Sequence, residues 1–229
     1  MAKKKKGITD DRIQGVESAL SKTEQFIEDN QKMLTIITMV IVVIVAGYLG
    51  YKRFIVYPAE EEAQSQMFVA EQYFERDSFN LALYGDGNYF GFLDIIEEYR
   101  ITKAANLAHY YTGISYLRLE EYEIAIEYLE KFDSDDMMLA PLTLGAIGDS
   151  YLELDDPEQA VEYYTRASRM KNNDFINPIY LLKAGKVYEN LGEYEKALEN
   201  YERIRNEYPE SQEGRTIEKY ITRVKLFLE

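Results

Sequence analysis

The chain has 229 residues and no cysteine, which excludes a disulfide framework, a thiolate metal site and a cysteine nucleophile. The net charge of −15 is unevenly divided, because residues 1–57 carry 9 Lys or Arg against 6 Asp or Glu, whereas residues 58–229 carry 17 against 35. A segment this acidic repels phosphate backbones, so we expect no nucleic-acid-binding function.

Residues 1–32 form a basic leader that contains a short amphipathic pattern. Five residues recur at spacings that place them on one face of a helix: Ile13, Val16, Leu20, Thr23 and Ile27. This face could lie on the membrane surface or on a partner helix, or the segment could merely extend the apolar helix that follows. The sequence leaves these alternatives open.

Residues 33–56 are predicted to form a transmembrane signal anchor. The stretch from Met33 to Tyr51 has no charged residue and is apolar on every side. It is long enough to cross a bilayer as a helix. A cleaved signal peptide needs a short leader and small residues after the apolar core, whereas bulky Tyr48 and Leu49 follow this one. We therefore expect an uncleaved anchor rather than a cleaved signal peptide or a buried core helix.

The basic residues on either side of the anchor predict its orientation. Seven Lys or Arg residues lie in the leader, whereas the other flank has Lys52 and Arg53 and then Glu60, Glu61 and Glu62. The positive-inside rule places the N-terminus in the cytoplasm and the acidic part outside. For a Gram-negative cell this predicts a single-pass protein of the bacterial inner membrane with a periplasmic C-terminal domain.

A repeated set of small and aromatic residues follows the anchor. A glycine is followed by a tyrosine three residues later, by an alanine twelve residues after the glycine, and by a second tyrosine. The sets are Gly113/Tyr116/Ala125/Tyr128, Gly148/Tyr151/Ala160/Tyr164 and Gly185/Tyr188/Ala197/Tyr201. The glycines are 35 and 37 residues apart, and this period indicates an array of helical repeats that presents binding surfaces.

The spacing within each set predicts a helical hairpin. The glycine is expected mid-way along the first helix and the alanine opposite it on the second, so that the two backbones approach closely and the tyrosines fill the space around them. Gly192 is expected to supply the left-handed residue that ends a first helix. Pro157 is expected at the entry of a second helix, where its missing N–H is not needed.

These residues resemble the tetratricopeptide repeat (TPR), whose unit has about 34 residues. Residues 106–211 are similar to three such repeats, and Pro209 stands where the repeat ends. The resemblance implies an all-α fold, a TPR-type α-solenoid of antiparallel helix pairs, here preceded by one transmembrane helix.

The flanking segments complete the expected array. Residues 57–105 are predicted to be a degenerate first helical repeat that a Gly-rich insertion at residues 85–91 interrupts. Three residues stand at repeat positions: Tyr73, Phe79 and Ala82. The glycine spacing of the insertion does not match a dinucleotide-binding motif. Residues 212–229 are predicted to form a C-terminal capping helix that seals the end of the solenoid.

No catalytic constellation is visible in the sequence. His109 occupies a packing position of a first helix, and the segment Asp133-Ser-Asp-Asp136 lacks the glycine and the distal glutamate of a calcium-binding loop. We therefore expect no enzymatic activity, no cofactor, no metal and no small-molecule substrate.

The TPR resemblance also implies a binding groove, because the first helices of the repeats form the concave surface of such arrays. The register of the repeats assigns these residues to a peptide- or protein-binding groove: Leu107, Tyr110, Ile114, Leu117, Arg118, Leu142, Asp149, Leu152, Lys186 and Glu189. The set is apolar at one end and of mixed charge at the other, which suits an extended or helical peptide with hydrophobic anchors. Alternatively, some of these residues pack against neighbouring helices.

The order of leader, anchor, repeats and final helix resembles the ancillary TPR subunit of the bacterial Sec translocon. This resemblance implies a membrane-anchored periplasmic adaptor that binds proteins at the translocon, either emerging secretory chains or chaperones. The alternative is a structural scaffold subunit of another cell-envelope complex, such as a secretion, gliding or cell-wall assembly machine.

Overall fold

The structure is a computed structural model that describes residues 24–170 and 173–229, and every regular element in these residues is helical. The predicted all-α fold class is therefore confirmed. The amphipathic pattern predicted for the leader lies mostly in residues 1–23, outside the described residues. The chain divides into two compact units, of which the first ends at Tyr57 and the second begins at Pro58.

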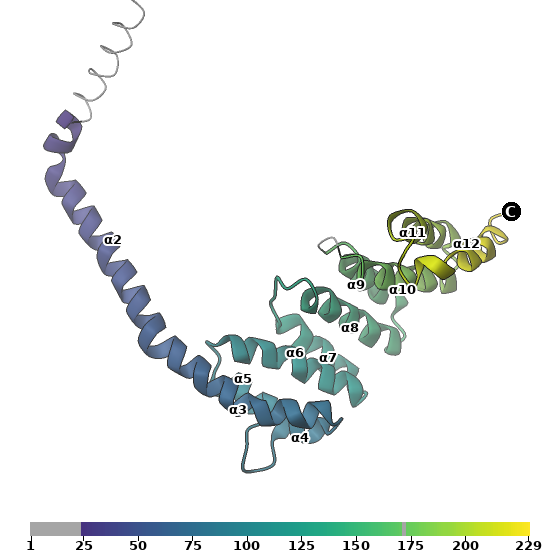
Figure 1. The fold of residues 1–229 in the computed structure, drawn as a ribbon, viewed down its shortest axis with the longest axis horizontal. Coiled ribbons are helices and arrows are strands. Elements are labelled where there is room, and N and C mark those ends of the chain that lie inside the picture. Colours follow the sequence, from purple (N-terminus) through teal and green to yellow (C-terminus); the bar gives the residue numbers. More distant parts are fainter. Residues whose placement is uncertain (1–23, 171–172) are drawn as a thin grey trace, which may run out of the picture. The chain divides into compact units, whose positions relative to one another are not determined.

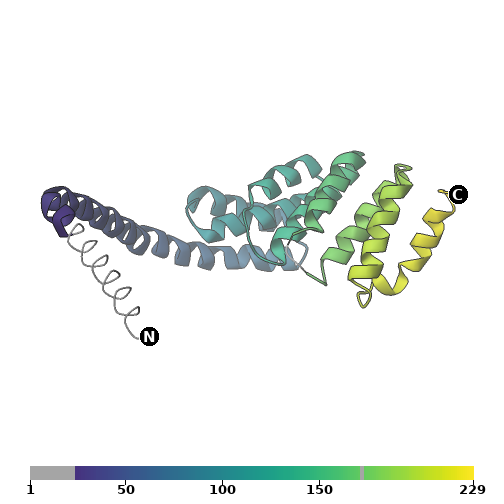
Figure 2. The same ribbon diagram turned by 90° about the horizontal axis from the view of Figure 1, so that it is seen from above.

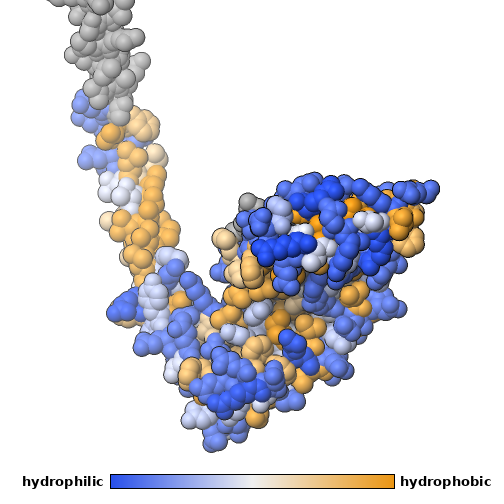
Figure 3. Space-filling view, turned by 45° about the vertical axis from the view of Figure 1, so that its right-hand side comes forward, coloured by the Kyte–Doolittle hydropathy of each residue, from blue (hydrophilic) through white to orange (hydrophobic). Residues whose placement is uncertain are grey.

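The first unit contains α2 (Gln31–Tyr51) and a π-helical turn, η1 (Lys52–Val56). No residue of α2 is buried, and its apolar side chains face outward along the helix (Figure 3). The hydroxyls of Thr35 and Thr38 donate to carbonyl oxygens four residues earlier, at 2.7 and 2.8 Å, so they are satisfied within the helix as an apolar solvent requires. α2 belongs to the one stretch of described residues that is long and apolar enough to cross a membrane.

The second unit is a stack of antiparallel helices (Figures 1 and 2). Its elements are α3 (Tyr57–Glu75), α4 (Phe79–Tyr84), α5 (Phe92–Glu98), α6 (Lys103–Arg118), α7 (Tyr122–Lys131), α8 (Leu139–Glu153), α9 (Pro157–Ala167), α10 (Asn177–Asn190), α11 (Tyr194–Glu207), the 3-10 turn η2 (Gly214–Thr216) and α12 (Glu218–Lys225). α6 packs with α7, α8 with α9, and α10 with α11, and each second helix also contacts the first helix of the next pair. The three pairs coincide with the three repeats of the Gly-Tyr-Ala pattern.

One type of turn ends the first helix of each pair. Glu120, Asp155 and Gly192 have positive φ angles of 65°, 60° and 75°. The next N–H then donates to the carbonyl oxygen of the repeat tyrosine at 2.8–3.0 Å, in the pairs Glu121–Tyr116, Asp156–Tyr151 and Glu193–Tyr188. This is the bonding pattern of a Schellman turn. Gly192 adopts the predicted conformation, and two acidic residues adopt it as well, because the short connection requires it.

The same turn joins α3 to α4. Asp77 has a φ of 55°, and the N–H of Ser78 donates to the carbonyl oxygen of Tyr73 at 2.9 Å. The Tyr73 hydroxyl also donates to Asp86 at 2.8 Å, which ties the Gly-rich segment 85–91 to α3. The α3–α4 hairpin thus shares the local geometry of the three repeats.

Close approach within a pair depends on the glycine of the first helix. A Cβ added to Gly148 would lie 2.7 Å from the ring of Tyr164, and one added to Gly185 would lie only 2.3 Å from the ring of Tyr201. Both rings are buried, since only 1% and 0% of their surfaces are exposed. The missing side chain therefore leaves the space that each ring fills, as the spacing predicts.

The first pair differs from the sequence prediction. Tyr128 was expected to fill the space beside Gly113, but Leu129 does so, with its Cγ atom 2.4 Å from a Cβ built on the glycine. Tyr128 is partly exposed and stacks on Tyr116 with 5.7 Å between ring centroids. The reason is helical phase, because the residue sixteen positions after the glycine faces it in all three pairs, and Tyr128 is the fifteenth.

The last helix closes the stack at its C-terminal end. Ile221 and Val224 of α12 are buried, together with Ile217, in a cluster that includes Tyr201 and Ile204 of α11. α12 thus covers the apolar face that the final pair leaves open.

Burial keeps several repeat tyrosines protonated. Burial, followed by the hydrogen bond and the charge of Glu130, raises the pKa of Tyr163 to about 12. Burial is also the largest cause of the raised pKa of four other tyrosines: Tyr116, Tyr164, Tyr180 and Tyr201.

These shifts predict alkaline destabilisation. Because the native pKa of Tyr163 is raised from about 10 to about 12, the unfolded chain loses this proton first, and the free energy of unfolding falls as the pH rises through that window. Below about pH 10 both states keep the proton and stability is unaffected. Denaturant unfolding of the full chain in detergent, followed by circular dichroism, should show this fall and a shallower one for Tyr163→Phe. Equal slopes for the two proteins would contradict the assignment.

The glycine contact predicts a second stability effect. Gly148→Ala should lower the free energy of unfolding by about 1–3 kcal/mol, because the new methyl group overlaps the Tyr164 ring. Thermal unfolding of the full chain in detergent measures the change. Glu195→Ala, at an exposed position of α11, is the control and should change stability by less than about 0.5 kcal/mol. A Gly148→Ala protein as stable as this control would refute the packing role of the glycine.

Candidate protein-binding groove

The inner helices α6, α8 and α10 line a hollow of about 600 Å³, which we call the groove. Its lining residues are Tyr110, Ile114, Leu117, Arg118, Glu120, Tyr122, Leu142, Ala146, Asp149, Leu152, Glu153, Tyr180 and Lys183. Leucine, isoleucine and tyrosine side chains make up much of this set, and charged groups stand among them. Such a lining can bind a chain segment through apolar contacts and a few polar ones.

The structure brings seven of the ten predicted groove residues together. They are Tyr110, Ile114, Leu117, Arg118, Leu142, Asp149 and Leu152. Leu152 is 42% exposed, which makes it the most accessible apolar member. Ile114 and Leu117 are half-buried because they also pack on a cluster with Ile126 and Ile147.

Three predicted residues do not line the groove. Leu107 packs against the cluster formed by α3, α4 and α5. The ammonium group of Lys186 lies over the ring of Tyr220, 5.6 Å from its centroid. Glu189 forms an ion pair with Arg223 of α12 at 2.6 Å. At both ends of the array, elements that flank the repeats therefore contact inner-helix residues that the register assigns to the groove.

An ion pair lies at the centre of the groove. Both carboxylate oxygens of Asp149 accept hydrogen bonds from the ammonium group of Lys183, at 2.6 and 2.8 Å. The Tyr164 hydroxyl donates to the same carboxylate at 2.5 Å. The ammonium group also stands 5.3 Å from the centre of the Tyr164 ring and 5.8 Å from that of Tyr180. The charge of Asp149 is thus neutralised within the protein.

Tyr180 and Lys183 are groove residues that the sequence reasoning missed. Tyr180 is 5% exposed and stacks on Tyr164 with ring centroids 6.1 Å apart. A Cβ added to Gly145 would lie 2.0 Å from the Tyr180 hydroxyl, so this glycine makes room for a ring from the next repeat. A glycine on an inner helix, followed 35 residues later by a tyrosine, was the signal that could have revealed the contact.

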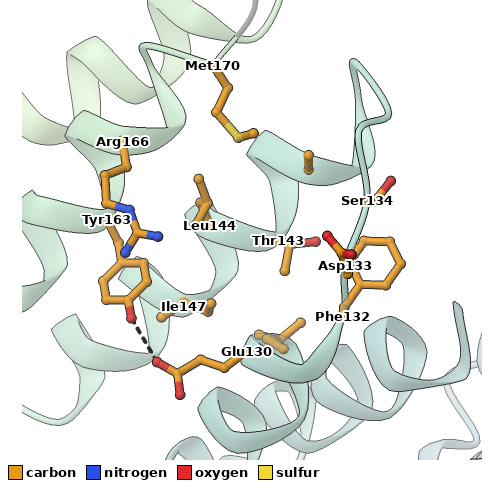
Figure 4. Close-up of a pocket in the computed structure, with 12 residues that line it drawn as sticks. Glu130, Phe132, Asp133, Ser134, Thr143, Leu144, Ile147, Tyr163, Arg166 and Met170 are labelled. Atoms are coloured by element: carbon orange, nitrogen blue, oxygen red, sulfur yellow. Dashed lines mark hydrogen bonds between the residues drawn. The ribbon is translucent and has the colours of Figure 1, made fainter. Parts of the chain in front are cut away.

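A second hollow of about 460 Å³ lies between α7, α8 and α9 (Figure 4). Leu144, Ile147 and Met170 contribute apolar atoms to it. On one side the Tyr163 hydroxyl donates to Glu130 at 2.8 Å, and the guanidinium of Arg166 lies 4.7 Å from the centre of the Tyr163 ring. None of the predicted groove residues belongs to this hollow.

Neither hollow contains a set of groups suited to catalysis. Among residues 24–170 and 173–229, no cluster of His, Asp and Glu side chains could hold a metal ion. His109 is half-buried, its pKa is lowered by burial and then by the charge of Lys131, and its Nδ1 has no hydrogen-bond partner in the described part of the chain.

Comparisons with known proteins agree with this architecture. Tetratricopeptide repeat family profiles match residues 143–174 and 180–211. The fold is similar to that in a crystal structure of MamA protein, with a TM-score of 0.53 and 18% identity over 73% of this chain and 88% of that chain. A search of curated proteins by sequence gave no match. Residues 143–174 and 180–211 therefore match the tetratricopeptide repeat, and the second unit has a TPR-like packing of helix pairs.

Proposed function

We propose that this protein is a membrane-anchored periplasmic adaptor that binds proteins at the Sec translocon, either emerging secretory chains or chaperones. The observation that carries this proposal is the groove, a 600 Å³ hollow lined by leucine, isoleucine and tyrosine side chains. TPR arrays generally bind proteins through the surfaces that their stacked helices present.

The chemistry of the groove favours a partner segment with apolar anchors. Asp149 is already paired with Lys183, so a partner gains little from a charge placed at the centre of the groove. Leu152 of α8 is exposed and Leu142 is half-buried, and Arg118 and Glu153 are exposed at the edge. An unfolded or helical segment of a newly exported chain supplies the apolar side chains that such a surface binds.

The apolar helix α2 supports the location. A chain with an exposed apolar helix near its N-terminus is held at a membrane, where translocation takes place. The basic leader and the acidic second unit support the orientation, with the N-terminus in the cytoplasm and residues 58–229 in the periplasm.

The proposed topology predicts the result of a protease-protection experiment. Protease added to spheroplasts should digest residues 58–229, because this part faces the periplasm, and should leave the leader intact. Immunoblots against tags at the two termini measure both outcomes. Intact cells, whose outer membrane excludes the protease, are the control, and survival of the C-terminal tag in spheroplasts would reverse the topology.

The proposed partner can be tested by photocrosslinking from the groove. A photoreactive residue at Leu152, which is 42% exposed, should form adducts with Sec components, secretory chains or a periplasmic chaperone in whole cells. The same residue placed at Glu195 on α11 is the control and should not form them. Adding Leu142→Glu to the Leu152 probe should lower the yield about tenfold, because an unpaired carboxylate in an apolar contact costs about 1–3 kcal/mol.

The outcomes separate the adaptor from a scaffold. Stoichiometric adducts with a fixed envelope complex that lacks the translocon would favour the structural scaffold. Recovery of neither a Sec component nor an exported chain would overturn the adaptor proposal.

A further inference from the structure

Exposed apolar side chains recur on the loops that join one repeat to the next. Met137 and Phe175 each stand two residues before the first residue of an inner helix, α8 or α10, and they are 52% and 75% exposed. Met138 is 44% exposed beside Met137. The two loops lie on the same edge of the stack (Figure 1). We call Met137, Met138 and Phe175 the loop ridge.

One buried amide holds the loop ridge together. The side chain of Asn173, whose residue is only 7% exposed, donates to the carbonyl oxygen of Met137 at 3.1 Å and lies 3.6 Å from the sulfur of Met138. Its carbonyl oxygen accepts from the N–H groups of Phe175 and Ile176 at 3.0 and 3.1 Å. Three exposed side chains from two loops are thus positioned by a single residue that solvent barely reaches.

The first loop is fixed at both of its ends. The backbone of Asp133 forms two hydrogen bonds with the side chain of Asn106, at 2.7 and 3.1 Å. The Asp136 carboxylate accepts from the N–H groups of Met138 and Leu139 at 2.7 and 2.9 Å. A surface that is ordered before binding loses less conformational entropy when it binds, so this loop is suited to docking.

A hollow adjoins the loop ridge. The same loop contributes Phe132, Asp133 and Ser134 to the 460 Å³ hollow described above, and Tyr163 and Arg166 lie on its opposite side (Figure 4). Leu144 lies between these two sides. An apolar side chain of a partner can therefore enter the hollow while its neighbours lie on the ridge.

The charge around the loop ridge identifies the class of partner. The two loops, residues 132–138 and 168–176, contain four aspartates against two basic residues, Arg169 and Lys171, so their net charge is negative. Asp133 and Asp174 are exposed, and the described part of the chain shows no ion pair at either of them. An apolar surface surrounded by carboxylates attracts a basic amphipathic helix and repels an anionic lipid surface.

We propose that the loop ridge binds a basic amphipathic helix of a partner protein. The apolar face of that helix covers Met137, Met138 and Phe175 and inserts one side chain into the hollow. Its Lys and Arg side chains lie against Asp133 and Asp174. The site is separate from the groove, so its occupant is a different segment from the one that the groove binds.

Photocrosslinking of the full chain in its own membranes tests this proposal. Photoreactive residues at Phe175 and, in a second strain, at Met138 should form an adduct with the same protein. The crosslinked segment, sequenced by mass spectrometry, should be amphipathic with a helical period and carry a net positive charge. An adduct with lipid, with a second copy of this chain or with an acidic segment would overturn the proposal, as would no adduct at either position.

Charge variants supply the matched control. Asp133→Asn with Asp174→Asn should lower the adduct yield roughly twofold to tenfold, since each exposed ion pair changes an equilibrium by a modest factor. The variant should fold normally, because Asn106 binds only the backbone of Asp133. Glu195→Gln with Glu199→Gln removes the same charge from α11 and should leave the yield unchanged. Equal yields from both variants would refute the proposal. The Leu152 probe, whose adducts should persist in all of these variants, reports separately on the groove.

Discussion

The fold depends on the close packing of a buried tyrosine ring against a glycine, which has no side chain to occupy that space. Gly148 and Gly185 leave space on the inner helices, and the rings of Tyr164 and Tyr201 fill that space from the outer helices. The contact brings the paired backbones close enough for the alanines opposite to be completely buried. A larger residue in place of either glycine forces the ring out of the core, and the pair no longer presents a closed face to its neighbour.

The same tyrosines connect the packing inside a repeat to the stacking of one repeat on the next. The Tyr164 hydroxyl reaches Asp149, which binds Lys183 of the following inner helix. The Tyr201 hydroxyl reaches Glu189, which binds Arg223 of α12. In both cases a tyrosine hydroxyl donates to a carboxylate, and the carboxylate pairs with a Lys or Arg of the next helix. Asp149 and Glu189 of the inner helices are therefore both paired within the protein.

The sequence was informative where contacts are local and less so where they cross between repeats. The spacing of Gly148, Ala160 and Tyr164 predicted the hairpin, because residues of one pair meet at a fixed helical phase. In the first pair, the tyrosine pattern predicts Tyr128, whereas helical phase places Leu129 against Gly113. The repeat register assigns Lys186 and Glu189 of α10 to the groove, whereas the structure places them against Tyr220 and Arg223 of α12. Tyr180 was missed because its position depends on how one repeat turns against the next, and a repeat pattern does not specify this angle.

The groove and the loop ridge differ in whether their carboxylates have a cation within reach. In the groove, Lys183 neutralises Asp149 at a half-buried site, where an unpaired carboxylate would be costly. Beside the loop ridge, the Asp133 and Asp174 side chains are exposed to water, where a carboxylate is stable without a partner inside the protein. The groove thus combines apolar side chains with a central carboxylate that is paired within the protein, whereas the carboxylates beside the loop ridge face water. The two surfaces therefore differ in chemistry, because a lysine of the next repeat reaches Asp149 and the described part of the chain offers no ion pair to Asp133 or Asp174.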